Sequence, residues 1–292
     1  MSKPLQSRVA IVTGAGAGLG RSHALELARH GARVVVNDLG TGAHAVAEEI
    51  RQAGGAAIAC VADVTRYEAM QDMAARVLGE FGRIDILVNN AGILRDRTFA
   101  KMPLDDFRLV LDVHLMGSVH AAKAVWPQMQ AQHHGRIVMT TSSSGLYGNF
   151  GQSNYAAAKM ALVGLMQTLA LEGAKHDIRV NCLAPSAATA MTEGLLPGDA
   201  ASVLTPERVS PALLALAGDD APTRMILLAG GGSFECAHVT MTQGIHIGGA
   251  QDLAATLCRR LKEVQEQDGQ FIPASGWEQP RHELAKAAGE PR

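Results

Sequence analysis

Short apolar runs alternate with helix-like segments along most of the chain. In the helix-like segments, apolar residues recur at the spacing of an amphipathic helix, and these segments cover 19–30, 44–52, 67–81, 104–132 and 153–176. The apolar runs that precede and follow them are predicted to be strands, at 9–12, 33–36, 56–61, 84–88, 136–141 and 178–183, with 225–229 as a candidate seventh.

The predicted strands are continuously apolar rather than alternately apolar and polar. This pattern is typical of strands buried on both faces, which occur in parallel sheets covered by helices. Strand–helix alternation makes each connection a right-handed crossover. We therefore expect a single α/β domain with a Rossmann-like, doubly wound parallel sheet of about seven strands and helices on both faces.

The pattern weakens beyond residue 183. Residues 185–199 are rich in Ala, Thr, Gly and Met, and we interpret them as a substrate-side loop. Residues 252–264 are predicted to be helical, and the polar tail from residue 267 is compatible with disorder at its end. We assign residues 1–245 to the main domain and 246–292 to a partly helical extension.

Composition excludes several classes of function. Apolar residues make up 47% of the 292 residues and the net charge is −2, so no strong field would attract a nucleic acid. The four cysteines form no C-x-x-C pair, and we expect no metal site. The sequence also lacks a long apolar leader segment, an apolar run of membrane-spanning length and a peroxisomal C-terminal signal. We therefore expect no membrane association and a cytoplasmic location.

A glycine-rich turn follows the first predicted strand and opens the first predicted helix. Its members expected to bind a cofactor are Gly14, Gly16, Gly18, Leu19 and Gly20. Glycines allow a tight turn and close approach of backbone to a pyrophosphate, while the helix N-terminus offers free N–H groups to the anion. A simple tight turn is the alternative interpretation.

Asp38 ends the second predicted strand, about 20 residues beyond the glycines. A carboxylate there can accept hydrogen bonds from ribose hydroxyls and would repel a 2′-phosphate, so NAD is favoured over NADP. The alternative is that Asp38 caps the following turn. We place Leu39 beside it in the same cofactor-binding set.

Two further loops follow strands. Asp63 follows the third strand and is predicted to meet the adenine amine, with a loop cap as the alternative; Val64 accompanies it. Asn90, Ala91 and Gly92 follow the fourth strand, where small residues let backbone pass the cofactor and an amide can tie strands together. A simple turn is again the alternative.

A tyrosine and a lysine form the candidate proton-transfer pair. Tyr155 and Lys159 are four residues apart on a predicted helix, so they share one face. An ammonium beside a phenol stabilises the phenolate, and we expect it to lower the pKa of the phenol. Ser142 ends the fifth strand at the edge where ligands bind such sheets, and its hydroxyl could hold the substrate oxygen. A surface Tyr/Lys pair is the alternative.

Taken together, Thr13-Gly14-x-x-x-Gly18-x-Gly20, Asn89-Asn90-Ala91-Gly92, Ser142 and Tyr155-x-x-x-Lys159 resemble the short-chain dehydrogenase/reductase family, over about residues 6 to 235. The resemblance implies hydride exchange between a nicotinamide and a carbonyl or alcohol carbon. It also implies that Tyr155 is the acid/base, that Ser142 orients the substrate oxygen, and that Lys159 binds the nicotinamide ribose.

Longer segments resemble one branch of that family. Val36-Asn37-Asp38-Leu39-Gly40, Leu94-Arg95-Asp96-Arg97 and Gly145-Leu146-Tyr147-Gly148-Asn149 are similar to the (3R)-hydroxyacyl-CoA dehydrogenase part of peroxisomal multifunctional enzymes. In the wider family an Asn stands where His114 is found, and this branch shares the histidine. Helix packing and direct catalysis are both open roles for His114.

The segment after the sixth strand departs from the family pattern. Pro185-Ser186 stands in place of the usual Pro-Gly, but the resemblance still places Pro185, Ala188 and Thr189 near the nicotinamide carboxamide. From Gly230 onward the similarity is loose.

We therefore expect an NAD-dependent oxidoreductase that interconverts a secondary alcohol and a ketone. The favoured substrate is a 3-hydroxyacyl-CoA or a bulky, steroid-like alcohol. Met191, Leu195 and Leu196 are a candidate apolar lid, with an ordinary core role as the alternative. Arg95, Arg97 and Arg224 are candidate partners of CoA phosphates. A dehydrogenase of ketones and cyclic or terpene alcohols without CoA is the alternative, and a non-catalytic NAD-binding regulator is a third hypothesis. The resemblance implies a homotetramer or a homodimer.

Overall fold

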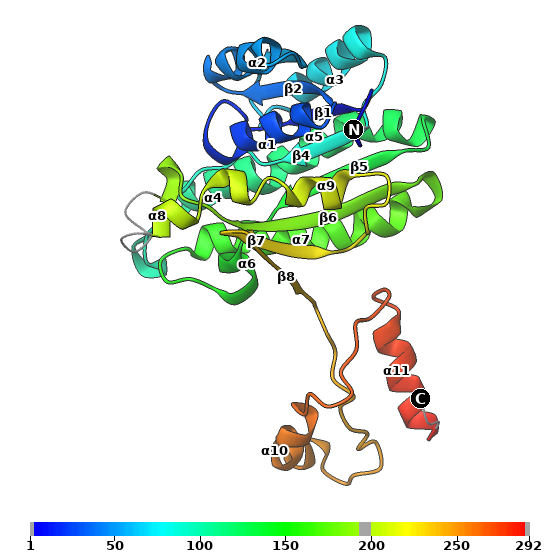
Figure 1. The fold of residues 1–292 in the computed structure, drawn as a ribbon. Helices are drawn as coiled ribbons and strands as arrows, with labels where there is room; N and C mark the ends of the chain where they lie inside the picture. The colour runs from blue at the N-terminus through cyan, green and yellow to red at the C-terminus, as the bar shows by residue number, and fades with distance from the viewer. Residues whose placement is uncertain (1–2, 193–199, 290–292) are drawn as a thin grey trace. The chain divides into compact units, whose positions relative to one another are not determined.

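The computed structural model describes residues 3–192 and 200–289 of the chain. It forms two compact units, residues 1–236 and 237–292, and each is described by itself. The first unit is a layered α/β structure built around one sheet (Figure 1).

The sheet contains eight strands in the order β3-β2-β1-β4-β5-β6-β7-β8 (Figure 1). The neighbouring strands from β3 to β7 are paired in parallel. The chain builds outward from β1 to β3, then returns to place β4 on the other side of β1, so β1 and β4 flank the switch point at which such sheets bind ligands. The strands are β1 (Val9–Val12), β2 (Arg33–Asp38), β3 (Ala56–Val61), β4 (Ile86–Asn89), β5 (Gly135–Thr140), β6 (Ile178–Ser186), β7 (Ile226–Gly230) and β8 (Ser233–Ala237).

Helices cover both faces of the sheet. On one face α1 (Gly18–Arg29) contacts α2 (Gly42–Gln52) and α9 (Ala212–Ala217). On the other face α3 (Tyr67–Phe81) contacts α5 (Gly117–Ala131), and α4 (Leu104–Leu111) contacts α7 (Ser153–Gly173). This arrangement confirms the predicted fold class.

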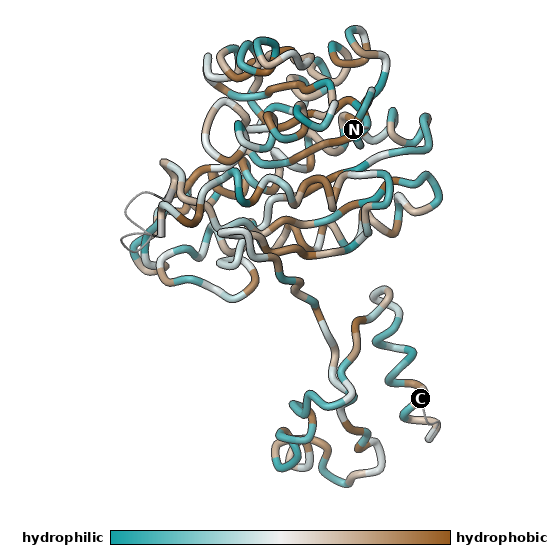
Figure 2. The backbone as a smooth tube through the Cα atoms, viewed as in Figure 1, coloured by the Kyte–Doolittle hydropathy of each residue, from teal (hydrophilic) through white to brown (hydrophobic). Residues whose placement is uncertain are grey.

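The core lies between the sheet and these helices. Residues of β1, β4 and β5 are buried throughout, and Figure 2 shows the strands largely in the brown of hydrophobic residues. Burial of such side chains is the main force that holds the layers together. It also explains why the apolar runs predicted the strands: a strand covered on both faces has no solvent-facing positions to fill with polar residues.

The helix predicted over 104–132 is interrupted. Between α4 and α5 the chain forms a π-helical segment, η2 (Asp112–Met116), which contains His114. Such wide turns are common at functional sites and are invisible to a search for 3.6-residue periodicity. The smaller elements are η1 (Phe99–Lys101), α6 (Ser143–Tyr147), η3 (Ala174–His176), η4 (Ala190–Thr192), α8 (Ala200–Val203) and η5 (Pro206–Arg208).

The sheet contains eight strands rather than about seven. The additional strand, β8, follows β7 after Gly231 and Gly232, both of which have positive φ. Four of its five residues are exposed, so the sequence contains no apolar run that would predict this strand.

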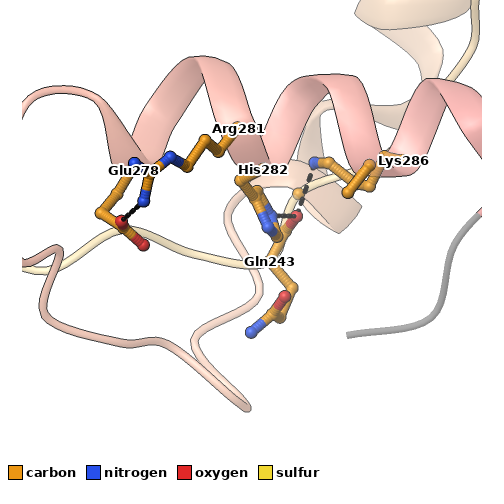
Figure 3. A pocket seen from close by; sticks show the side chains of 7 residues that line it. Gln243, Glu278, Arg281, His282 and Lys286 are labelled. Atoms are coloured by element: carbon orange, nitrogen blue, oxygen red, sulfur yellow. Dashed lines mark hydrogen bonds and ion pairs between the residues drawn. The ribbon is translucent and has the colours of Figure 1, made fainter.

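Over residues 237–289, the part of the second unit that the structure describes, there are two helices. The first, α10 (Leu253–Val264), was predicted from the sequence and begins where the Asp252 carboxylate accepts the backbone N–H of Ala255 at 2.9 Å. The second, α11 (Glu278–Ala288), was not predicted, because its sequence is polar and contains Pro280. Figure 3 shows His282 and Lys286 of α11 converging on the backbone carbonyl of Gln243, to which they donate at 2.9 and 2.7 Å.

Within residues 3–192 and 200–289, every helix is too short or too polar to cross a lipid bilayer.

Candidate active site

The glycine-rich turn between β1 and α1 has no room for a side chain at Gly14 or Gly20. Gly14 and Gly18 have φ angles of 62° and 53°, a region that favours glycine. A Cβ atom on Gly14 would lie 2.7 Å from the Cα of Ala91, and one on Gly20 would lie 2.2 Å from the carbonyl oxygen of Gly14. The turn therefore has the close-approach geometry that a pyrophosphate requires at the N-terminus of α1.

The Asn90 side chain ties this turn to the loop that follows β4. Its Nδ2 donates to the carbonyl oxygens of Thr13 and Gly14 at 3.0 and 3.1 Å. In return, the Thr13 hydroxyl accepts the backbone N–H groups of Asn90 and Ala91 at 3.0 and 3.1 Å. These bonds link the two loops at the switch point, as the sequence predicted for Asn90, whereas the contribution of Thr13 was not foreseen.

Asp38 faces the same turn from the end of β2. Its carboxylate accepts the backbone N–H of Gly16 at 2.9 Å and that of Gly40 at 3.1 Å. A carboxylate can accept about four hydrogen bonds, so these two contacts leave capacity for ribose hydroxyls. The adjacent Leu39 side chain is 68% exposed, which suits a residue that would be covered by a ligand. Together with the glycine turn, Asp38 fits the adenosine half of a dinucleotide.

Asp63 caps its own loop. Its Oδ1 atom accepts both the backbone N–H and the hydroxyl of Thr65 at 2.8 Å. This is the capping geometry of the alternative interpretation, although the same side chain lies next to the end of β3, where the adenine contact was predicted. Val64 is buried, and its carbonyl oxygen lies 3.0 Å from Nδ1 of His120.

The segment after β6 returns to the glycine turn. A Cβ atom on Gly18 would lie 3.6 Å from the side chain of Thr189, so these two predicted cofactor contacts are neighbours. Ala188 is held by its backbone N–H, which donates to Leu204 at 2.6 Å, and Pro185 lies within β6. Leu195 and Leu196, the predicted lid residues, lie outside the described residues, whereas Met191 is 42% exposed.

Ser142, Tyr155 and Lys159 come together at the carboxyl ends of the strands. Ser142 follows β5 and caps α6, where its hydroxyl accepts the backbone N–H of Ser144 at 3.1 Å. Tyr155 and Lys159 lie one turn apart on α7, with Nζ of Lys159 at 5.5 Å from the centre of the Tyr155 ring. The ammonium donates to the Thr140 carbonyl oxygen at 2.6 Å, which fixes it beneath the phenol.

Burial dominates the ionisation of this pair. It raises the pKa of the Tyr155 phenol; a hydrogen bond with Ser142 opposes the rise and the charge of Asp96 adds to it. Burial also lowers the pKa of Lys159 to about 7. The expectation that the ammonium lowers the pKa of the phenol is therefore wrong for the protein alone, because both groups are removed from water and each is favoured in its neutral form.

His114 packs against the tyrosine rather than pointing away from the site. Its ring meets the Tyr155 ring edge-on, with centres 5.2 Å apart, and its Nε2 lies 3.0 Å from the backbone nitrogen and 2.8 Å from the carbonyl oxygen of Ile93. Burial lowers the pKa of His114 to about 3, so the imidazole is neutral at physiological pH. A Cβ atom on Gly92 would lie 2.3 Å from this ring, so the glycine makes room for it.

A second set of contacts beside Tyr155 had no signal in the sequence. The loop after β4 and the loop before α7 are joined by hydrogen bonds from Gln152 to Asp96, from Arg97 to Gly151 and from Asn154 to Arg95. Their partners are about 55 residues apart in sequence and follow no short spacing pattern.

Arg224 lies at the amino-terminal ends of the strands, opposite the carboxyl ends where Ser142 lies. It precedes β7, and its Nε atom donates to Gln167 at 2.5 Å. Because Gln167 is 12 residues beyond Tyr155 on α7, about 18 Å along the helix, Arg224 is not a neighbour of the site. In contrast, Arg95 and Arg97 flank Asp96 in the loop beside Tyr155.

Among the described residues, no group of three or more His, Cys, Asp or Glu side chains is arranged to hold a metal ion.

Comparisons with known proteins agree with this geometry. Residues 8–198 match the family model of the short chain dehydrogenases. A protein of Mycobacterium tuberculosis assigned to the short-chain type dehydrogenases/reductases is 46% identical over 282 residues, which cover 92% of this chain and 97% of the relative.

Two further similarities concern proteins with named activities or ligands. The peroxisomal multifunctional enzyme type 2 of Mus musculus is 48% identical over 226 residues, which cover 73% of this chain but only 30% of that enzyme. The solved structure of a 7α-hydroxysteroid dehydrogenase complexed with NADH and 7-oxo glycochenodeoxycholic acid has a TM-score of 0.74 and 32% identity, covering 80% of this chain and 96% of that one.

Proposed function

The chain belongs to the short-chain dehydrogenase family, and from this premise we propose that it is an NAD-dependent oxidoreductase that interconverts a secondary alcohol and a ketone. The observation that carries the proposal is the convergence of Ser142, Tyr155 and Lys159 at the carboxyl ends of the strands. His114 packs between Tyr155 and Gly92, which follows the Asn90 that is bonded to the glycine turn. A bound nicotinamide dinucleotide supplies or accepts the hydride in this chemistry.

The side chains of this protein would handle the proton. The Oη atom of Tyr155 donates a proton to a carbonyl oxygen in reduction and takes it from a hydroxyl in oxidation. The Ser142 hydroxyl donates a hydrogen bond to the same substrate oxygen and so holds it against Tyr155. The Lys159 ammonium, anchored on the Thr140 carbonyl, would bind ribose hydroxyls and stabilise negative charge on the phenol.

Asp38 supports NAD as the cofactor. Its carboxylate is held by two backbone N–H groups at the end of β2, so a 2′-phosphate there would meet a fixed negative charge. Neither the glycine turn nor the residues directly after Asp38 supply an arginine or lysine to offset that charge.

The proposed substrate is a 3-hydroxyacyl-CoA or a bulky, steroid-like alcohol. The similarity to the multifunctional enzymes supports the first class, and Arg95 and Arg97 beside Tyr155 could meet CoA phosphates. The likeness to the bile-acid-bound hydroxysteroid dehydrogenase supports the second class. The chain spans less than a third of the multifunctional enzyme. The proposal therefore includes none of the activities of the other parts of that enzyme.

A substrate panel tests the proposal. Turnover is followed by absorbance of the reduced nicotinamide with 3-hydroxyacyl-CoA esters, hydroxysteroids and cyclic alcohols, each with NAD⁺ and NADP⁺. We expect turnover of an acyl-CoA or a steroid, with NAD⁺ preferred. NAD(H) binding without turnover of any secondary alcohol or ketone would favour a non-catalytic regulator, and a preference for cyclic alcohols would favour the alternative without CoA.

We also propose self-association as a homotetramer or homodimer. The helices α4 and α7 expose apolar side chains that another copy could cover, namely Leu104, Leu109, Met160 and Leu171. Sedimentation of the purified protein measures the assembly directly, and a monomer would overturn this part of the proposal. A cytoplasmic location also remains a prediction.

A further inference from the structure

The residues beside Tyr155 include a carboxylate that the proposed chemistry does not use. Asp96 lies in the loop after β4, and its Oδ2 atom accepts Nε2 of Gln152 at 2.7 Å. Within the described part of the chain Asp96 forms no salt bridge: Arg95 instead approaches Asp106 at 3.9 Å. The negative charge of Asp96 is therefore paired with a neutral amide.

Gln152 connects Asp96 to the helix that carries Tyr155. Its side chain is buried, with an exposed fraction of 5%, and its Oε1 accepts Nδ2 of Asn149 at 3.1 Å, so both ends of the amide are satisfied. Its backbone carbonyl accepts the N–H of Ala156 at 2.7 Å, the first helical hydrogen bond of α7. Moving Gln152 would therefore move the turn that holds Tyr155.

Two other hydrogen bonds join the same loops without using a charge. The backbone N–H of Arg97 donates to the Gly151 carbonyl at 2.8 Å, and the buried Asn154 side chain donates to the Arg95 carbonyl at 3.0 Å. A neutral side chain could complete this arrangement equally well in place of Asp96. The hydrogen bonds between these loops therefore do not by themselves require the charge of Asp96.

Two titratable side chains contact the phenol ring, and a third acts on it through its charge. Lys159 on α7 lies beneath the ring, and the neutral His114 of η2 meets it edge-on. Asp96 acts from the loop after β4 and disfavours the charged phenolate, which adds to the effect of burial on the pKa of Tyr155. Burial and Asp96 thus shift the pKa of Tyr155 in one direction, and the hydrogen bond with Ser142 shifts it in the other.

We propose that Asp96 is a positioning residue for Tyr155: its carboxylate holds the Gln152 amide that fixes the start of α7, and it places a negative charge in the loop joined to that helix. The inference rests on the proposed function, because it concerns the group assigned there as the acid/base. By keeping Tyr155 protonated, Asp96 favours the form that donates to a carbonyl oxygen.

Two substitutions separate the two roles. Asp96→Asn keeps an oxygen that can accept from Gln152 but removes the charge, whereas Asp96→Ala removes both. Asp105→Asn on α4 is the matched control, because that carboxylate is 97% exposed and contacts only Arg108 among the described residues. The three variants are made in the full-length protein, and their affinities for NADH are compared with that of the unchanged protein.

The direct measurement is the titration of Tyr155 itself. In a Tyr67→Phe/Tyr147→Phe background Tyr155 is the remaining tyrosine, and its ionisation is followed by tyrosinate absorbance. We expect Asp96→Asn to move the midpoint to lower pH by about 0.5–1 unit, and the pH limb of alcohol oxidation to move with it. Asp105→Asn should leave both unchanged.

Turnover tests the positioning role. Asp96→Asn, which keeps an acceptor for Gln152, should lower kcat less than Asp96→Ala does. Asp96→Ala should lower kcat about tenfold or more with little change in NADH affinity. Unchanged midpoints in Asp96→Asn would overturn the role of the charge, and unchanged kcat in Asp96→Ala would overturn the positioning role. Lack of turnover by the unsubstituted protein would instead overturn the proposed function, since the Tyr155 titration does not depend on turnover.

Discussion

The Nζ atom of Lys159 lies 5.5 Å from the centre of the Tyr155 ring and donates to the Thr140 carbonyl oxygen at 2.6 Å. The lysine is thus held by the last residue of β5 while it faces a phenol on its own helix. Its burial lowers the pKa of the amine from 10.5 to about 7, so the ionisation of Lys159 is coupled to folding.

The first prediction concerns this coupling. Between pH 7 and the usual lysine value of 10.5, the unfolded chain binds a proton at residue 159 that the folded chain does not. The free energy of unfolding should therefore rise with pH by about 1.4 kcal/mol per unit in this window. In Lys159→Met that contribution is absent.

Denaturant unfolding of the unchanged protein and of Lys159→Met at pH 8, 9 and 10 measures this pH-dependent contribution to the free energy of unfolding. The stability of the methionine variant relative to the unchanged protein should decrease as the pH rises, while its turnover is lost at every pH. A constant difference in stability across this range would mean that Lys159 is already an ammonium in the folded protein.

A second prediction concerns the close fit of Gly92 and His114. Gly92→Ala places a methyl group against the imidazole and should destabilise the protein by about 1–3 kcal/mol. Removing the ring with His114→Ala frees that space, so the double variant should be more stable than the sum of the single effects by about 1 kcal/mol or more. Chemical denaturation of the four proteins checks this, and strictly additive effects would show that the two residues do not compete for the same space.

The sequence predicted the fold well where burial left a pattern. Strands β1 and β3 and helix α3 have the predicted bounds, because continuous apolar runs and helical periodicity follow directly from burial. The π-helical segment around His114 and the exposed strand β8 carry no such periodicity, so neither was predicted.

For the candidate site, the sequence predicted which residues would meet but not how they are held. The spacing of Tyr155 and Lys159 on one helix is a local property, and a helix places them together whatever surrounds it. The Thr140 carbonyl beneath Lys159 and the Gln152 amide beside Asp96 depend on contacts across the fold. The direction of the pKa shift at Tyr155 was predicted wrongly for the same reason, because burial cannot be read from a spacing of four residues.

A third prediction concerns cofactor choice. Asp38→Asn removes the charge expected to exclude a 2′-phosphate and weakens the acceptor for ribose hydroxyls. The preference for NADH over NADPH, taken as the ratio of their dissociation constants, should fall about 10- to 100-fold. Titration of each nucleotide by fluorescence provides both constants.

The matched control for Asp38 is Asp63→Asn. That carboxylate caps the loop at Thr65, and its proposed adenine contact is common to both nucleotides. The substitution should therefore change both affinities alike and leave their ratio intact. If Asp38→Asn also leaves the ratio intact, selectivity for NAD does not come from the end of β2.

The measurement that most directly tests the account compares turnover and NADH binding in Tyr155→Phe, with Tyr147→Phe as the control, since Tyr147 is 69% exposed on the neighbouring α6. Loss of the phenolic hydroxyl should lower kcat by about 10²–10⁴-fold while the dissociation constant of NADH changes little, and the control should keep its activity. If Tyr155→Phe turns over its substrate as fast as the unchanged protein, Tyr155 is not the acid/base and the central claim is wrong.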